Sequence, residues 1–150
     1  MKSGYMVRDF MNHRPVICSE NDTLAKVCKL MHDHALSSLI VRENDKLVSK
    51  DKIIEAFGKG KTENTKIKDA DVYRTMYCCE PDIDLVDALE LIIKNKSRRL
   101  CVKEKGKVTG IISMKDIFLV VPTIFEKMEY AEVMRKTRFG EGEEYRVLKK

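Results

Sequence analysis

A serine and an aspartate stand close together in the stretch "GIISMKDIF", from Gly110 to Phe118. Ser113 ends a strand-like apolar run and Asp116 opens a helix-like run, so both side chains project from one strand-to-helix junction. A serine hydroxyl and the free amides of a helix start can donate hydrogen bonds to phosphate oxygens. An ionised carboxylate can accept two hydrogen bonds from a vicinal diol, each worth about 1.5 to 3 kcal/mol. The pair is therefore suited to a ligand that carries a phosphate and a diol.

The same two residues also have a purely structural interpretation. Asp116 could cap the helix that it opens, and Ser113 could be a strand-end hydroxyl whose hydrogen bonds are satisfied locally. The spacing of the two residues leaves both interpretations open. The elements that position the pair are therefore the next question.

Length and composition predict a folded domain. A chain of 150 residues can bury roughly two thirds of its unfolded surface. The hydrophobic share is 43% and the charged share is 35%, with too few glycines and prolines for a disordered chain. No apolar run approaches the roughly 20 residues needed to cross a bilayer, and the start "MKSGYMVRDF" lacks the hydrophobic stretch of a secretory signal. We therefore expect a cytoplasmic protein with no membrane partner.

The cysteines and the net charge limit the kinds of site that are expected. Five cysteines form no C-x-x-C pair, and their odd number argues against a closed disulfide framework. Cys78 and Cys79 are adjacent, so they cannot easily share a tetrahedral zinc ion, and no histidine spacing complements them. No metal site and no cofactor are expected. The net charge of +5 favours anionic ligands but is too small to indicate a dedicated nucleic-acid surface.

One sequence unit occurs twice in the chain. An offset of 61 residues carries residues 21–48 onto residues 82–109 without a gap, and the apolar pattern agrees although identities are few. The matched apolar pairs include Leu24 with Leu85, Leu30 with Leu91, Leu39 with Leu100, and Val41 with Val102.

Each half predicts a strand, a helix, two strands and a second helix. The first helix of each half has apolar residues at helical spacing and follows polar residues that can cap it. The two strands after it are short, apolar and bounded by polar turns. The capping candidates are Asn21 or Asp22 in the first half, and Asp82 or Asp84 in the second. The expected strands are "SSLIV" and "KLV" in the first half, and "RRLCV" and "KVTGIIS" in the second. The second helix is expected to begin near Asp51 in the first half and near Asp116 in the second.

These features together resemble a tandem pair of cystathionine-beta-synthase (CBS) domains, often called a Bateman module. The resemblance rests on the order of elements, the duplication, "MVRDFM" near the start and "GIISMKD" near the end, and it covers Tyr5 to Val121. It implies an α+β fold of two β-α-β-β-α repeats that pack through their sheets with pseudo-two-fold symmetry. It also implies that adenosine-containing ligands bind in clefts between the repeats, with Ser113 contacting phosphate and Asp116 holding the ribose hydroxyls.

The resemblance divides the chain into four parts. The expected parts are a first repeat at 5–57, a polar linker at 58–66, a second repeat at 67–121, and a C-terminal helix and tail at 122–150. The last helix is expected to start at Pro122.

Three further residues become site candidates through the resemblance. Arg98 and Arg99 stand where the family often has basic residues that face the phosphates. Arginine suits phosphate geometry, but consecutive strand residues point to opposite faces, so the two need not reach one ligand together. Cys79 lies in the stretch where family members supply contacts to adenine.

The first repeat departs from the pattern of the second. The offset between the repeats changes from 61 to 65 where Asp51 meets Asp116, so four residues are absent. We assign the gap to Gly110 through Ser113, which leaves Asp51 without a strand or a serine. In the alignment of the two repeats, Ser37 and Ser38 correspond to the two arginines and carry no charge. The first repeat is therefore expected to be degenerate, and the chain to have at most one nucleotide cleft.

The resulting functional hypothesis is a regulatory module rather than an enzyme, because no catalytic motif is present. It would bind an adenine nucleotide or an S-adenosylmethionine-like ligand and signal to an unidentified partner protein. The resemblance also implies a homodimer. One alternative is a protein-interaction scaffold that needs no ligand. Another is weak nucleic-acid binding, which is less favoured because no aromatic stacking platform accompanies the lysines.

Overall fold

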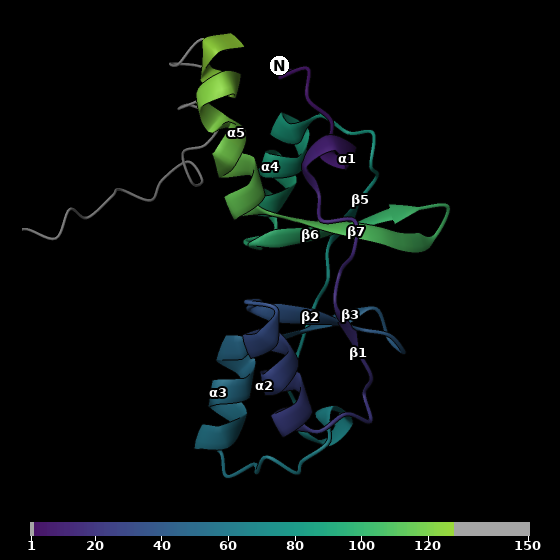
Figure 1. Ribbon diagram of the computed structural model, residues 1–150, viewed down its shortest axis with the longest axis vertical. Helices are drawn as coiled ribbons and strands as arrows, with labels where there is room; N and C mark the ends of the chain where they lie inside the picture. The colour runs from purple at the N-terminus through teal and green to yellow at the C-terminus, as the bar shows by residue number, and fades with distance from the viewer. Residues whose placement is uncertain (1, 128–150) are drawn as a thin grey trace, which may run out of the picture. The chain divides into compact units, whose positions relative to one another are not determined.

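The computed structural model of the chain describes residues 2–127 and divides them into two compact units (Figure 1). Residues 12–76 form the first-repeat unit. Residues 2–11 and 77–127 together form the second-repeat unit. Each unit has its own sheet and its own hydrophobic core.

The first-repeat unit contains a four-stranded sheet and two α-helices of at least nine residues. Its elements are β1 (Ile17–Cys18), α2 (Leu24–Asp33), β2 (Ser38–Val41), β3 (Lys46–Ser49), α3 (Lys50–Gly58), the 3₁₀ turn η1 (Ile67–Asp69) and β4 (Tyr73–Arg74). The sheet order is β1-β2-β3-β4, and only the β1–β2 pair is parallel. Leu39, Val41 and Val48 point from the sheet into a core that α2 and α3 complete.

The second-repeat unit repeats this plan with a three-stranded sheet. Its elements are α1 (Val7–Phe10), β5 (Cys78–Cys79), α4 (Leu85–Lys94), β6 (Arg99–Glu104), β7 (Lys107–Ser113) and α5 (Met114–Lys127). The order is β5-β6-β7, with β5 parallel to β6 and β7 antiparallel to it. Leu100, Val102 and Ile112 point into the core, which α4 and α5 cover on one face of the sheet (Figure 1).

The predicted α+β fold and the order of elements in both halves are confirmed. Helices α2 and α4 begin at Leu24 and Leu85, which are the same position of the repeat. Asp84 caps α4 as predicted, because its side chain accepts a hydrogen bond from Val86 N. The predicted caps of α2 are wrong: Thr23 accepts from Lys26 N instead.

The prediction that the first repeat lacks a strand and its serine is wrong. Strand β3 forms, and Ser49 pairs with Ser38 as Ser113 pairs with Arg99. Most of the shortening falls at the far end of the hairpin, where residues 42–45 stand in place of residues 103–109, which include the last residues of β6 and the first of β7. Strand β4 pairs with the outer side of β3, so β3 is not an edge strand of the sheet. The shorter hairpin lacks counterparts of the pairs Lys103–Val108 and Glu104–Lys107, but it keeps the four pairs from Ser38–Ser49 to Val41–Lys46, so β3 and Ser49 are retained.

Helix α5 runs without interruption through Pro122, so the prediction of a new helix beginning there is wrong. Proline has no backbone N–H and therefore removes one helical hydrogen bond, but neighbouring turns can continue on both sides of it. The remainder of the predicted C-terminal helix and tail, residues 128–150, lies outside the described residues. No helix within residues 2–127 is both long enough and apolar enough to cross a bilayer.

Residues 2–11, which include the start of the predicted first repeat, pack in the second-repeat unit. Leu85 N donates to Tyr5 O at 2.9 Å, and Val7 N donates to Ile83 O at 3.0 Å. Val7 is fully buried in the core of this unit. The start of the chain is therefore part of the same compact unit as residues roughly 80 positions later.

Residues 61–76, which include the start of the predicted second repeat, pack in the first-repeat unit in the corresponding way. Leu24 N donates to Thr65 O and Ile67 N donates to Asp22 O, both at 2.9 Å. Ile67 is also fully buried. Residues 61–66, expected to be a linker, thus lie against the start of α2, where Ala25 N donates to Glu63 O. The start of each predicted repeat therefore packs in the unit formed by the rest of the other repeat.

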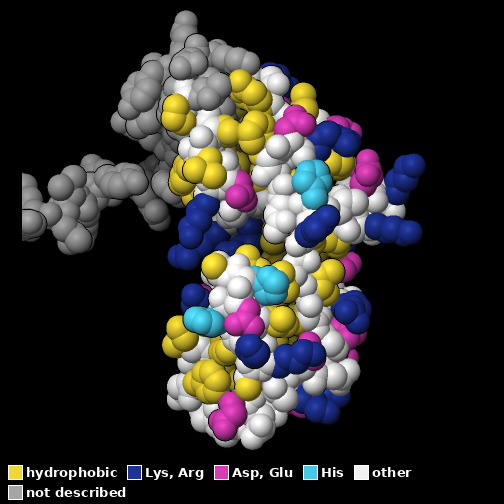
Figure 2. All heavy atoms as spheres, in the orientation of Figure 1, with side chains coloured by type: hydrophobic (Ala, Val, Ile, Leu, Met, Phe, Trp, Pro, Cys, Tyr) yellow, Lys and Arg dark blue, Asp and Glu magenta, His cyan; other side chains and the backbone are white. Residues whose placement is uncertain are grey.

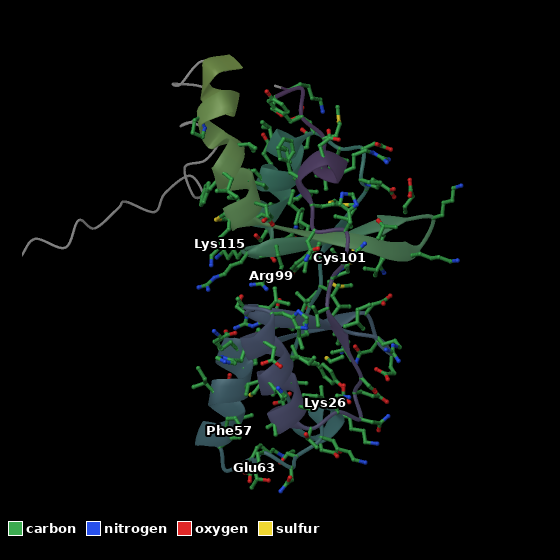
Figure 3. All side chains as sticks on the ribbon, in the orientation of Figure 1. Lys26, Phe57, Glu63, Arg99, Cys101 and Lys115 are labelled. Carbon is green, nitrogen blue, oxygen red and sulfur yellow. The ribbon has the colours of Figure 1, made fainter. Side chains whose placement is uncertain are left out.

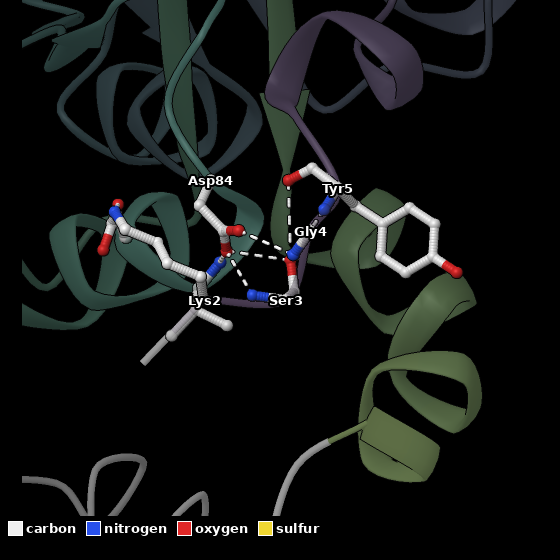
Figure 4. A network of polar contacts seen from close by, with 7 residues as sticks. Lys2, Ser3, Gly4, Tyr5 and Asp84 are labelled. Carbon is white, nitrogen blue, oxygen red and sulfur yellow. Dashed lines mark hydrogen bonds and ion pairs between the residues drawn. The ribbon is translucent and has the colours of Figure 1, made fainter.

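Asp84 fastens the N-terminal segment to the start of α4 (Figure 4). Its carboxylate accepts hydrogen bonds from Ser3 N at 3.0 Å, Ser3 Oγ at 2.8 Å, Gly4 N at 2.9 Å and Val86 N at 2.9 Å. Gly4 has a φ of +80°, a conformation that glycine adopts without strain. Asp84 is 2% exposed, so these donors replace the water that the buried carboxylate has lost.

Candidate functional site

Ser113 and Asp116 form a reciprocal cap at the start of α5. Asp116 Oδ2 accepts hydrogen bonds from Ser113 N and from Ser113 Oγ, both at 2.7 Å. In return, Ser113 Oγ accepts from Asp116 N at 3.3 Å. This is a capping box, in which two free donors of the helix start are satisfied by two side chains. Both hydrogen bonds to the carboxylate use Oδ2, so the second oxygen, Oδ1, has no part in the cap.

The local sequence explains why the pair sits at this junction. Strand β7 ends at Ser113, and α5 begins at the next residue, Met114. Met114 N donates to Arg98 O at 2.9 Å, a hydrogen bond between the two residues that directly adjoin the paired strands at this end of the sheet. Ile112 and Ile117 are fully buried on the two sides of the junction. These two anchors hold the partly buried Ser113 and Asp116 between them.

Arg99 lies directly beside Ser113 in the sheet. The two residues are register partners in the antiparallel β6–β7 pair, so their side chains leave the same face. Leu100 and Val102 point to the opposite face, into the core under α4 and α5. Arg99 is half-buried and, like Cys101, comes from β6 (Figure 3). Arg98 precedes the strand and is exposed.

Cys79 lies apart from these residues. It is 9% exposed and belongs to the core of the second-repeat unit. Burial raises the pKa of its thiol to about 11, so it is a neutral core thiol at physiological pH. Of the five candidates, the structure therefore brings together Ser113, Asp116 and Arg99, places Arg98 at the adjacent strand start, and directs Cys79 into the core.

The first-repeat unit has a counterpart that sequence reasoning missed. Arg74 Nε donates to Ser49 Oγ at 2.9 Å, and the same guanidinium forms an ion pair with Asp51. The arginine comes from β4 and not from β2, where Ser38 stands opposite Ser49. The alignment of the two repeats stops before β4 and therefore held no signal for this partner.

The Ser49 hydrogen bond is the main reason why the pKa of Asp51 lies below its ordinary value. Partial burial opposes this shift, and Arg74 adds to it. We expect Arg74→Ala to raise the Asp51 pKa only part of the way to normal, because the serine remains. Carbon-13 NMR titration of the Asp51 carboxyl would measure this. Because both partners of the ion pair are about half exposed or more, the free energy of unfolding should change by less than about 1 kcal/mol.

Ser49→Ala is the matched variant for this titration. It should also raise the Asp51 pKa, because it removes the largest single contribution, whereas Arg74→Ala removes a hydrogen bond and a charge attraction together. A larger rise in Arg74→Ala would show that the ion pair, not the serine, controls this carboxylate.

Ser113, Asp116 and Arg99 together can bind a ligand that carries an anionic group and, next to it, a hydroxyl group. The guanidinium and the serine can donate to phosphate oxygens, and the carboxylate can accept from hydroxyls. Across residues 2–127, no cluster of three or more histidine, cysteine or acidic side chains has the arrangement needed for a metal ion.

Comparison with known proteins agrees with this architecture. One relative, an uncharacterized protein of Methanopyrus kandleri, is 28% identical over 124 residues, which are 79% of this chain. The chain spans only 62% of that relative's length.

Two solved structures share the fold. The crystal structure of CBSX2 in complex with AMP has a TM-score of 0.67 at 22% identity and covers 81% of this chain and 98% of its own. The hexameric CBS-CP12 protein from bloom-forming cyanobacteria has a TM-score of 0.72 at 20% identity and covers 86% of this chain and 77% of its own.

The duplication also appears in the family comparison. The family model of the CBS domain matches the sequence twice, at residues 7–57 and again at residues 67–123. Together the two matches include most of the chain and both strand-to-helix junctions described above. The chain therefore belongs to the CBS-domain family and contains two such domains.

Proposed function

We propose that this protein is a regulatory CBS module that binds an adenine nucleotide or a related adenosyl ligand through its second repeat. The observation that carries the proposal is the grouping of Arg99, Ser113 and Asp116 around the start of α5. One cation, one hydroxyl and one carboxylate match the phosphate and the ribose diol of such a ligand. The AMP complex of CBSX2, which shares the fold, supports this ligand class.

Binding would use atoms that the cap leaves available. Oδ1 of Asp116 can accept from the ribose hydroxyls while Oδ2 keeps its hydrogen bond from Ser113 N. Ser113 Oγ would turn its proton from Oδ2 to a phosphate oxygen, and Arg99 would add charge from the neighbouring strand. The ligand would therefore replace the hydrogen bond from Ser113 Oγ to Oδ2 and leave the two backbone hydrogen bonds of the cap in place.

The proposal includes no catalytic step; the effect of the ligand is conformational. A ligand that prefers one conformation by a coupling free energy of about 1 to 3 kcal/mol would change the affinity for a partner protein about 5- to 150-fold. We place this activity in the cytoplasm. The five cysteines are all free, which suits a reducing compartment.

Calorimetric titration with AMP, ADP, ATP and S-adenosylmethionine tests the proposal. We expect saturable binding of at least one of these ligands with about one site per chain. Two equivalent sites would instead show that the first repeat, with Ser49, Asp51 and Arg74, binds as well. No heat with any ligand would favour a ligand-independent scaffold, in which Ser113 and Asp116 only cap α5. A steep loss of affinity for oligonucleotides with salt would favour nucleic-acid binding.

We also propose that the module forms a homodimer. Hydrophobic side chains are exposed on the second helix of each repeat: Ile54 and Phe57 are 65% and 42% exposed on α3, and Phe118 and Leu119 are 55% and 83% exposed on α5. Figure 2 shows hydrophobic surface over both helices. Apolar patches of this kind favour association, and the hexameric CBS-CP12 protein shows that a related fold can self-associate.

Charged substitutions on these helices should weaken the dimer. We expect Ile54→Glu combined with Leu119→Glu to raise the dissociation constant of the dimer at least tenfold, because each substitution places a carboxylate on apolar surface. Sedimentation equilibrium measures the shift. Lys105→Glu, at an exposed hairpin turn that belongs to neither helix, is the control and should not change the dimer. A wild-type protein that is monomeric at all concentrations would contradict the proposal.

A further inference from the structure

Two cysteines that are distant in sequence lie side by side in the sheet of the second-repeat unit. Cys78 of β5 and Cys101 of β6 are register partners in the parallel pair, and Cys101 N donates to Tyr77 O at 2.8 Å. Partnered residues on adjacent strands direct their side chains to the same face. Adjacent strands are about 4.8 Å apart, which lies within the Cα separation of about 4.4 to 6.8 Å at which disulfides form.

The fold does not require thiols at these two positions. The corresponding register partners in the first-repeat unit are Ile17 and Ile40, an apolar pair that supports the same parallel strand pairing. Cys79 points to the opposite face of β5 and belongs to the core. The dithiol is therefore a feature of the second repeat alone and lies on the face that also carries Arg99.

The two thiols differ in their access to solvent. Cys78 is exposed, whereas Cys101 is fully buried beside it. A small oxidant can therefore reach Cys78 directly, while Cys101 is positioned to react with the oxidised product. This is the arrangement of an exposed reacting thiol and a neighbouring resolving thiol.

We propose that Cys78 and Cys101 form a dithiol that peroxide oxidises to a disulfide. Cys78 loses its proton and the thiolate attacks a peroxide oxygen; the O–O bond breaks, the sulfenic acid forms, and the departing hydroxide takes up the proton that the thiol lost and leaves as water. The Cys101 sulfur then attacks the sulfenic sulfur, loses its proton, and expels hydroxide, which leaves as water. In total the two thiols lose two electrons and two protons, and hydrogen peroxide is reduced to two molecules of water.

The modification does not depend on the proposed nucleotide. It would join the edge strand β5 covalently to the strand that carries Arg99, two residues before Cys101. A thiol reductant such as dithiothreitol would reverse it.

Peptide mapping of the full chain tests the proposal. The protein is treated with hydrogen peroxide, its remaining thiols are alkylated, and it is digested with trypsin without reduction. Cys78 and Cys79 fall in the peptide 75–94, and Cys101 falls in the peptide 100–103. We expect the two peptides to be joined by a disulfide, to separate on reduction, and to stay unjoined in Cys78→Ser.

Two further variants keep the test decisive. Cys79→Ala should still give the joined peptides, since Cys79 faces the core. Cys101→Val retains a small apolar side chain in the strand and should accumulate Cys78 sulfenic acid that dimedone traps. A disulfide confined to the peptide 75–94, a dimer linked through Cys78 on a non-reducing gel, or an unreacted Cys78 would each overturn the proposal.

Discussion

Replacing Asp116 with alanine is expected to lower the affinity for the adenosyl ligand by about a hundredfold or more. The reason is that an ionised carboxylate holding both hydroxyls of a ribose contributes two charged hydrogen bonds, each worth about 1.5 to 3 kcal/mol. Calorimetry with whichever of the four ligands binds the wild-type protein most tightly measures the loss. Removing the carboxylate also removes the acceptor for Ser113 N, so thermal unfolding of the variant must be measured in parallel.

Asp51→Ala is the matched control for this experiment. Asp51 occupies the corresponding place in the first repeat, next to Ser49 and in an ion pair with Arg74. If the second repeat alone binds the ligand, this variant keeps the wild-type affinity and stoichiometry. A hundredfold loss in Asp51→Ala with no loss in Asp116→Ala would assign the ligand to the first repeat and refute the proposed site.

The second large effect concerns stability. Asp84→Ala should lower the free energy of unfolding by about 2 to 4 kcal/mol, because it removes a helix cap worth about 1 kcal/mol and leaves buried donors unsatisfied at about 1 to 3 kcal/mol. The affected donors are on Ser3, Gly4 and Val86, so the variant should also release the N-terminal segment. Urea unfolding at neutral pH measures the first effect, and hydrogen exchange at Val7 N measures the second.

The pH dependence of this effect has a definite sign. Burial alone would raise the pKa of Asp84, but the hydrogen bonds from Ser3, Val86 and Gly4 outweigh it and hold the pKa below its ordinary value. The contribution of the carboxylate is therefore fully present above about pH 4, the unfolded-state value, and is lost as the pH falls through the folded-state pKa. The difference between wild type and Asp84→Ala should shrink accordingly below pH 4.

Thr23→Ala provides the control for the capping effect. Thr23 caps α2 at the same position of the first repeat, but its hydroxyl is neutral and accepts from Lys26 N alone. We expect a loss of about 1 kcal/mol that does not change between pH 3 and pH 7 beyond the wild-type dependence. An equally small, pH-independent loss in Asp84→Ala would show that the buried network contributes little.

The amino-acid sequence by itself determined the duplication, the α+β class and the order of the elements. These features depend on local patterns: apolar residues at helical spacing placed α2 and α4, and short apolar runs between polar turns placed β2, β3, β6 and β7. The spacing of Ser113 and Asp116 across a strand-to-helix junction likewise predicted that the two side chains would be close, and they are hydrogen-bonded.

Tertiary structure alone decided which distant segments came together. Ser3 and Asp84 are separated by 81 positions, and Arg74 reaches Ser49 and Asp51 through a strand of two residues. The missing residues of the first repeat fell mainly at the far end of the hairpin and not at Ser49, so the four pairs between β2 and β3 that lead to the helix junction are kept. Local patterns extend over three or four residues, whereas strand register and segment exchange depend on burial and hydrogen bonding across the folded unit.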